Sequence, residues 1–152
     1  MSLESTSSTD EVKGGPRGQE RTFSNSLKYL LCPVNHFNEH WALAAIYFEE
    51  KKICWYDSLG KTDYYKLYHL LQYLEDAHKA CTDPTKGTFD RDEWELVPCP
   101  LDVPNQSNTY DCGVFLCMFA DFIMNDMPLV FSQEHINKCR ERIAYQIIKH
   151  PY

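Results

Sequence analysis

The run Trp41-Ala42-Leu43-Ala44-Ala45-Ile46-Tyr47-Phe48 decides the fold. It is apolar throughout and as long as a strand, which predicts a β-strand covered on both faces. A polar turn, Glu49-Glu50-Lys51-Lys52, follows it, and Ile53-Cys54-Trp55-Tyr56-Asp57 is predicted to return as the antiparallel partner. The short apolar stretch from Leu30 to Val34 predicts a further strand upstream.

Three helices and one more strand are expected downstream. Leucines at helical spacing predict a helix from about 63 to 80, and the almost wholly apolar stretch from about 111 to 124 predicts a buried central helix. Ser132, with Gln133 and Glu134, is expected to open an amphipathic helix that runs to about 149. Residues 94–98 alternate like a strand. Strands first, with helices packed around them, indicate an α+β fold.

Composition limits the class of protein. The chain has 152 residues, of which 43% are hydrophobic, enough for one domain with a real core. Its net charge of −7 argues against binding to nucleic acid, and no apolar run is long enough to span a bilayer. We therefore expect a soluble intracellular domain at 27–152, preceded by a flexible polar leader at 1–26.

The cysteines do not form a pattern typical of a disulfide scaffold. Their number, seven, is odd, and most lie in apolar runs, which predicts buried reduced thiols in a cytosolic or nuclear protein. No Cys-x-x-Cys pair is present, so no four-thiolate zinc site is expected.

Cys112 differs from the others because it lies in the first turn of the predicted helix 111–124. The free N–H groups and partial positive charge of a helix N-terminus favour a thiolate and can hold an oxyanion beside it. Gly113 follows and would let a substrate backbone approach closely. A nucleophilic cysteine also needs a general base, which must be oriented by an acceptor.

His40 and Asp57 are the candidates for that base and that acceptor, since both lie at the same end of the predicted hairpin. A turn centred between Glu50 and Lys51 places Asp57 opposite Ala44, four residues or roughly 13 Å from His40. Residues 40 and 44 face the same way, so a bulge or a sheared, twisted pairing is expected to close the gap.

Gln106 precedes Cys112 by six residues, in the loop that leads into the nucleophile's helix. Its side-chain amide is a candidate second donor to an oxyanion, and such a donor contributes about 3–4 kcal/mol of transition-state stabilisation. In an Asn- and Ser-rich loop, Gln106 is alternatively a solvated side chain.

A competing pattern is His36-Phe37-Asn38-Glu39-His40, which matches the His-x-x-Glu-His motif of some zinc peptidases. That chemistry requires both histidines on one helix. Because Pro33 precedes the motif and an apolar strand follows it, a loop is predicted instead. No third ligand is apparent, and neither a metal nor a cofactor is expected.

Taken together, His40-Trp41, Asp57-Ser58-Leu59 and Gln106 followed by Cys112-Gly113 resemble the ubiquitin-like-protein-specific proteases. These are the SUMO (sentrin)-specific cysteine peptidases of papain-like fold. The resemblance extends from about 27 to 150, and the segments 128–135 and 140–142 look closest to the SUMO-specific branch.

The resemblance implies a role for each of these residues. Cys112 would be the nucleophile, His40 the general base and later acid, and Asp57 the orienting carboxylate. Gln106 would join the Cys112 backbone N–H in the oxyanion hole. Trp41 would cover a narrow tunnel that admits the Gly-Gly end of the modifier, where only residues without a Cβ fit.

The implied activity is that of an isopeptidase and processing peptidase, which cleaves SUMO-type modifiers after their C-terminal Gly-Gly. SUMO and its conjugates are the expected partners, without nucleic acid or membrane and with the chain a monomer. The nucleus, and also the cytoplasm, are the expected locations. In the family, the catalytic domain extends far upstream of the first strand predicted here. The alternative is therefore a shortened domain, weakly active or inactive, that serves as a binding module.

Overall fold

The computed structural model describes residues 27–150, and the predicted leader 1–26 lies outside the described residues. Its four strands form one sheet in the order β1-β2-β3-β4. The first three strands are antiparallel neighbours, while β4 runs parallel to β3. The strands span β1 Tyr29–His36, β2 His40–Tyr47, β3 Lys52–Tyr56 and β4 Glu95–Val97.

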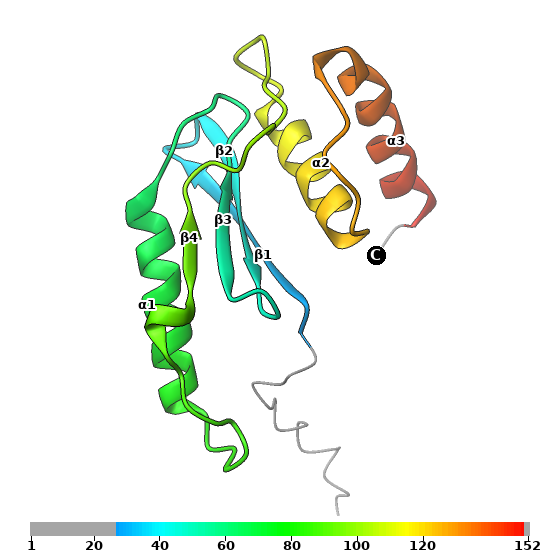
Figure 1. Cartoon of the computed structure of the whole chain (residues 1–152). Helices are drawn as coiled ribbons and strands as arrows, with labels where there is room; N and C mark the ends of the chain where they lie inside the picture. The colour runs from blue at the N-terminus through cyan, green and yellow to red at the C-terminus, as the bar shows by residue number, and fades with distance from the viewer. Residues whose placement is uncertain (1–26, 151–152) are drawn as a thin grey trace, which may run out of the picture.

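Helices cover both faces of this sheet, which confirms the predicted α+β class. Helix α1 lies on one face, and helices α2 and α3 lie on the other (Figure 1). Single 3-10 turns at Arg91–Glu93 and Gln133–His135 precede β4 and α3. The helices span α1 Tyr64–Ala80, α2 Cys112–Met124 and α3 Ile136–Lys149.

Strand β2 is the central element because alternate residues of β2 enter two different cores. Leu43 and Ala45 pack in the core beneath α2, whereas Ala42, Ala44 and Ile46 pack in the core beneath α1. All five are at most 1% exposed. Side chains of a strand alternate between the faces of a sheet, so only an unbroken apolar run satisfies both cores.

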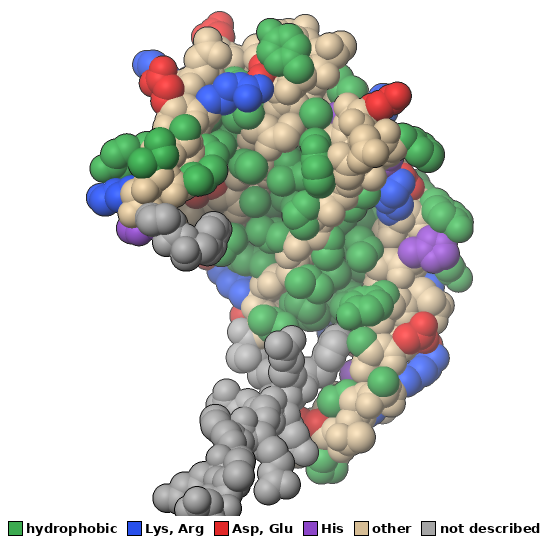
Figure 2. Space-filling model, turned by 180° about the vertical axis from the view of Figure 1, so that it is seen from behind, with side chains coloured by type: hydrophobic (Ala, Val, Ile, Leu, Met, Phe, Trp, Pro, Cys, Tyr) green, Lys and Arg blue, Asp and Glu red, His purple; other side chains and the backbone are tan. Residues whose placement is uncertain are grey.

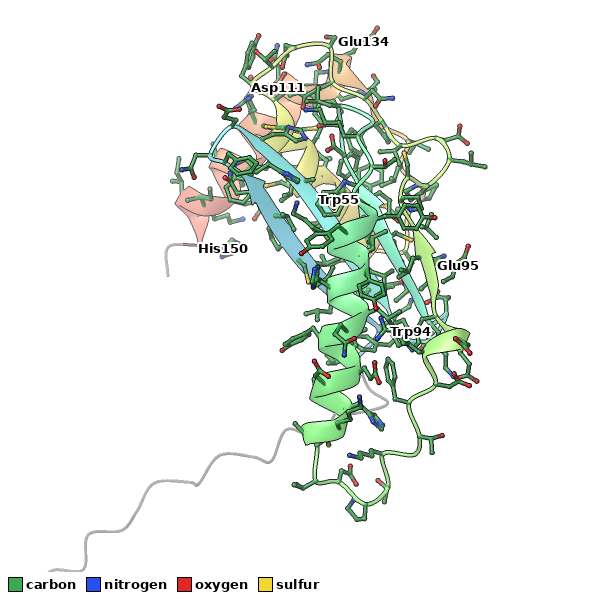
Figure 3. The ribbon with its side chains drawn as sticks, turned by 90° about the vertical axis from the view of Figure 1, so that its left-hand side faces the viewer. Trp55, Trp94, Glu95, Asp111, Glu134 and His150 are labelled. Atoms are coloured by element: carbon green, nitrogen blue, oxygen red, sulfur yellow. The ribbon has the colours of Figure 1, made fainter. Side chains whose placement is uncertain are left out.

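The core beneath α1 is built on Trp55 and three leucines of the helix. Trp55 is fully buried and lies beside α1 (Figure 3). Leu67, Leu71 and Leu74 supply the helix side of this core. The Asp63 side chain begins α1 as its N-cap, because Asp63 Oδ1 accepts a hydrogen bond from Lys66 N at 3.0 Å.

The core beneath α2 is aromatic. Phe115, Phe119 and Phe131 lie with ring centroids 5.6–6.2 Å apart, the spacing at which tilted aromatic rings attract. The expectation that helix α2 is buried on all sides is wrong, because Cys117 and Met124 on this helix are exposed.

Helix α3 covers one side of α2 incompletely. Among its residues only Ile136 is buried, while Ile147 and Ile148 are 62% and 78% exposed. An apolar groove of about 480 Å³ runs between α2 and α3, with Tyr110, Val114, Cys117 and Ile143 in its lining. Seen from behind, the molecule shows broad hydrophobic areas at its surface (Figure 2).

Two further expectations need correction. All seven cysteines are free, as predicted, but Cys99 and Cys117 are exposed, and only Cys54 and Cys112 are buried. The last helix begins with a 3-10 turn, and the capping partner of Ser132 is His135 rather than Gln133 or Glu134. His135 Nδ1 accepts a hydrogen bond from Ser132 N at 3.0 Å.

None of the helices within 27–150 is both long and apolar enough to cross a membrane.

Phe115→Ala is expected to lower the free energy of unfolding by about 3–5 kcal/mol, because it removes a fully buried ring and leaves a cavity. Phe37→Ala is the matched control, since Phe37 is 93% exposed and its loss is expected to cost less than about 0.5 kcal/mol. Urea denaturation followed by circular dichroism measures both. Equal losses in the two variants would contradict this account of the core.

Candidate active site

His40 and Asp57 form a buried pair at one end of the β2–β3 hairpin. His40 Nε2 and Asp57 Oδ1 are 2.8 Å apart, and the two residues are 8% and 2% exposed. The same carboxylate oxygen accepts a hydrogen bond from Leu59 N at 2.7 Å. The chain turns back there: Gly60 N donates to Asp57 O at 2.9 Å, and Gly60 has a φ of +68°, which favours glycine. The turn therefore fixes the carboxylate that orients the imidazole.

The register of this hairpin differs from the prediction. Leu43 pairs with Tyr56, and Tyr47 pairs with Lys52. When this register is continued by one residue, Asp57 lies opposite Ala42 rather than Ala44. The turn begins one residue earlier than expected and ends at Lys51, whose φ of +48° is left-handed. His40 and Asp57 are thus about two residues, or roughly 7 Å, apart along the strands, and their side chains span that distance without a bulge.

Gln106 is bound to the residue that follows Asp57. Gln106 N donates to Ser58 O at 2.8 Å, and Ser58 Oγ donates to Gln106 Oε1 at 2.6 Å. Ser58 is 1% exposed and Gln106 is 9% exposed. Gln106 is therefore not the solvated loop residue of the alternative reading. Gln106 Nε2 carries two N–H bonds, and one of them donates to Asn108 O at 2.6 Å. The other has no hydrogen-bond acceptor among the described residues.

Cys112 is the first residue of α2 and is 6% exposed. Asp111 O accepts hydrogen bonds from Val114 N and Phe115 N at 2.9 and 3.0 Å. Within the described chain, the N–H groups of Cys112 and Gly113 have no hydrogen-bond acceptor. Two unpaired amides beside a sulfur are the arrangement that binds an oxyanion.

Trp41 lies against this helix start. A Cβ placed on Gly113 would be 3.8 Å from Trp41 Cδ1, so the beginning of β2 and the beginning of α2 are side by side. Trp41 remains 41% exposed. Among the described residues no hydrogen bond joins the Cys112 thiol to the His40 ring. Because Asp57 holds Nε2, Nδ1 is the ring nitrogen that remains for the thiol.

The alternative zinc motif does not form a helix. His36 ends β1 and His40 begins β2, and they are cross-strand partners with ring centroids 6.1 Å apart. Burial lowers the pKa of His36, and the nearby Lys66 cation lowers it further. The predicted loop is a three-residue turn at the tip of a hairpin.

Sequence reasoning missed a buried carboxylate next to Cys112. Asp111 is 4% exposed and lies at the start of α2 (Figure 3). Burial by itself would raise the pKa of Asp111, but hydrogen bonds from Asn108, Arg140 and Gln133 outweigh it and hold the pKa below its usual range. Only the local Asn108–Asp111 spacing is visible in the sequence, because the other two donors come from a distant segment.

Comparison with known protein families gives a match to the Ulp1 protease family, C-terminal catalytic domain, over residues 2–152. This range includes most of the predicted leader. Human sentrin-specific protease 2 is 34% identical over 122 residues, which are 78% of this chain and 20% of that protein. Ubiquitin-like-specific protease 1 of Saccharomyces cerevisiae is 31% identical over 130 residues, 86% of this chain and 20% of that protein. The chain thus spans about a fifth of these relatives.

Solved structures agree with this match. The C-terminal Ulp1 protease domain in complex with Smt3, the yeast ortholog of SUMO, aligns with a TM-score of 0.63 and 31% identity over 81% of this chain and 53% of that one. The SUMO protease Ulp1 with its catalytic cysteine oxidised to a sulfenic acid aligns with a TM-score of 0.64 and 28% identity, with the same coverage. The chain belongs to the Ulp1 protease family and matches its C-terminal catalytic domain.

Proposed function

We propose that this chain is a thiol-dependent peptidase that matures SUMO-type modifiers or removes them from their conjugates. The observation that carries the proposal is a path of hydrogen bonds and backbone that joins three of the predicted site residues, His40, Asp57 and Gln106. It runs from the His40–Asp57 pair, along the backbone to Ser58, and across to Gln106 in the loop that leads to Cys112. A nucleophile at a helix start, an oriented imidazole and a fixed amide are the parts that acyl transfer requires.

In the proposed reaction, His40 Nδ1 takes the proton of the Cys112 thiol, and the sulfur attacks the carbonyl carbon of the modifier's last glycine. The Cys112 and Gly113 amides and the spare N–H of Gln106 stabilise the oxyanion. His40 then protonates the departing lysine amine, which leaves a thioester on Cys112. Water activated by His40 hydrolyses the thioester and releases the modifier. Asp57 holds the ring throughout.

The substrate class follows from two considerations. Relatives that match most of this chain are named as sentrin-specific or ubiquitin-like-specific proteases, and one was solved in complex with a SUMO ortholog. In addition, Trp41 lies next to Gly113, the residue after Cys112, and we expect its ring to narrow the substrate's approach to the thiol. A chain end without side chains, such as Gly-Gly, suits a narrow approach.

A second candidate is a domain that binds a modifier without cleaving it. The observation that favours it is the lack of a hydrogen bond between the Cys112 thiol and His40 in the described chain. A SUMO joined to a lysine side chain separates the two candidates. Multiple turnovers of free SUMO support the peptidase, whereas binding with no product supports the binding domain.

A SUMO whose C-terminal glycine carries a thiol-reactive electrophile is expected to form one covalent adduct, at Cys112. Cys112→Ser is expected to abolish that adduct. Cys117→Ser is the control and is expected to react like the unchanged protein, because Cys117 lies beyond the first turn of α2, whose free N–H groups favour a thiolate. Peptide mapping by mass spectrometry identifies the site, and an adduct on another cysteine would refute the assignment of the nucleophile.

Gln106→Ala is expected to lower kcat about 100- to 1,000-fold with little change in KM, because it removes a donor used in the transition state. Ser58→Ala is expected to lower kcat about tenfold, because Gln106 Oε1 loses its partner. The exposed Ser107, changed to alanine, is the control. Steady-state kinetics on a SUMO–lysine conjugate test all three. A rise in KM at unchanged kcat for Gln106→Ala would contradict the oxyanion role.

A further inference from the structure

Asp111 stands at the N-cap position of α2 but does not act as an N-cap. An aspartate there ordinarily turns its carboxylate to the N–H of the second or third helical residue. Asp111 makes no such side-chain bond. Its carboxylate is instead 95% buried and points toward the segment that contains α3.

Three side chains hold the carboxylate in that direction. Arg140 on α3 donates to Oδ1 through both Nε, at 3.2 Å, and Nη2. Oδ2 accepts hydrogen bonds from Gln133 Nε2 at 2.7 Å and from Asn108 Nδ2 at 2.6 Å. The fork of Arg140 also reaches Tyr110 O, at 3.4 Å. Arg140 is the only cation in contact with this carboxylate among the described residues.

This arrangement affects the nucleophile in two ways. With the carboxylate held by Arg140, the N–H groups of Cys112 and Gly113 stay unpaired and available to an oxyanion. The positive guanidinium also compensates a negative charge that lies one residue from the sulfur. Without Arg140, a buried carboxylate would be left with two neutral donors, and the N–H groups of Cys112 and Gly113, unpaired within the described chain, follow it directly in the sequence.

We propose that Arg140 is a positioning residue for Cys112: it keeps the Asp111 carboxylate off the first turn of α2 and cancels its charge. The inference rests on the proposed function, because it takes the unpaired N–H groups of Cys112 and Gly113 to bind an oxyanion. Its two consequences are distinct. The electrostatic consequence is that the Cys112 thiolate is stabilised. The steric consequence is that the N–H groups of Cys112 and Gly113 stay free to bind an oxyanion.

The elements that meet at this end of α2 carry other titratable groups. His40 comes from β2 and Asp57 from the turn after β3, where they bind each other. Glu134 and His135 belong to the 3-10 turn, and His135 is engaged by Ser132. None of these four contacts the Asp111 carboxylate. A change at Arg140 therefore alters the charge next to Cys112 and leaves the His40–Asp57 and Ser132–His135 contacts in place.

The test follows the alkylation of Cys112 by iodoacetamide as a function of pH, with the modified peptide quantified by mass spectrometry. Arg140→Gln is expected to move the midpoint of the profile about one pH unit upward, because the uncompensated carboxylate disfavours the thiolate. Asp111→Ala combined with Arg140→Gln is expected to bring the midpoint most of the way back to that of the unchanged protein, because the uncompensated carboxylate is no longer present. Arg142→Gln is the control, because Arg142 pairs with the exposed side of α2 through Asp121.

A profile for Arg140→Gln that coincides with that of the unchanged protein would overturn the proposal. A midpoint for the double variant as high as that of Arg140→Gln would also overturn it, because that result is expected if the arginine has a merely structural role. Arg140→Lys keeps the cation and is expected to keep the midpoint, so it serves as the test if Arg140→Gln does not fold. A midpoint for Arg140→Lys that lies about one pH unit above that of the unchanged protein would also overturn the proposal.

The alkylation readout needs no SUMO. Failure of the proposed function would appear as an absence of turnover with the SUMO–lysine conjugate. Failure of the present inference would appear as unchanged alkylation profiles, whether or not the conjugate is cleaved.

Discussion

The pair of hydrogen bonds between Ser58 and Gln106 is the constraint on which the rest of the site depends. One bond joins the two backbones and the other joins the two side chains, and both lie in the buried interior. They connect the β2–β3 hairpin, which holds His40 and Asp57, to the loop that leads into α2. Together with the packing of β2 against α2 and the contact between Trp41 and Gly113, they set the position of His40 relative to Cys112.

The alternation of β2 explains how one strand serves two purposes. His40 shares the face of Ala42 and Ala44, toward α1, and this is also the face on which Asp57 follows Trp55. Trp41 shares the face of Leu43, toward α2, and meets Gly113 there. Neighbouring residues at the start of a single strand therefore lie on opposite faces of the sheet, His40 with Asp57 on one side and Trp41 beside the start of α2 on the other.

The sequence predicted those features that depend on local pattern. The apolar run of β2, the helical leucines of α1 and the position of Cys112 at a helix start were readable because each is periodic or local. The hairpin register was misplaced by two residues, since it depends on the left-handed conformation of Lys51 in a turn without glycine. The Arg140–Asp111 contact was not readable at all, because it requires the docking of α3 against α2. The roles of the site residues remain predictions.

The sequence separations within the site imply an order of assembly during folding. His40 and Asp57 are 17 residues apart, whereas Ser58 and Gln106 are 48 apart. Closing the longer loop costs about 1 kcal/mol more in chain entropy, and during synthesis its far end leaves the ribosome much later. The imidazole–carboxylate pair can thus form in a nascent chain that still lacks Cys112. A growing polypeptide would thus hold this pair before Cys112 is added, and it would add Arg140 with the rest of α3 only after that.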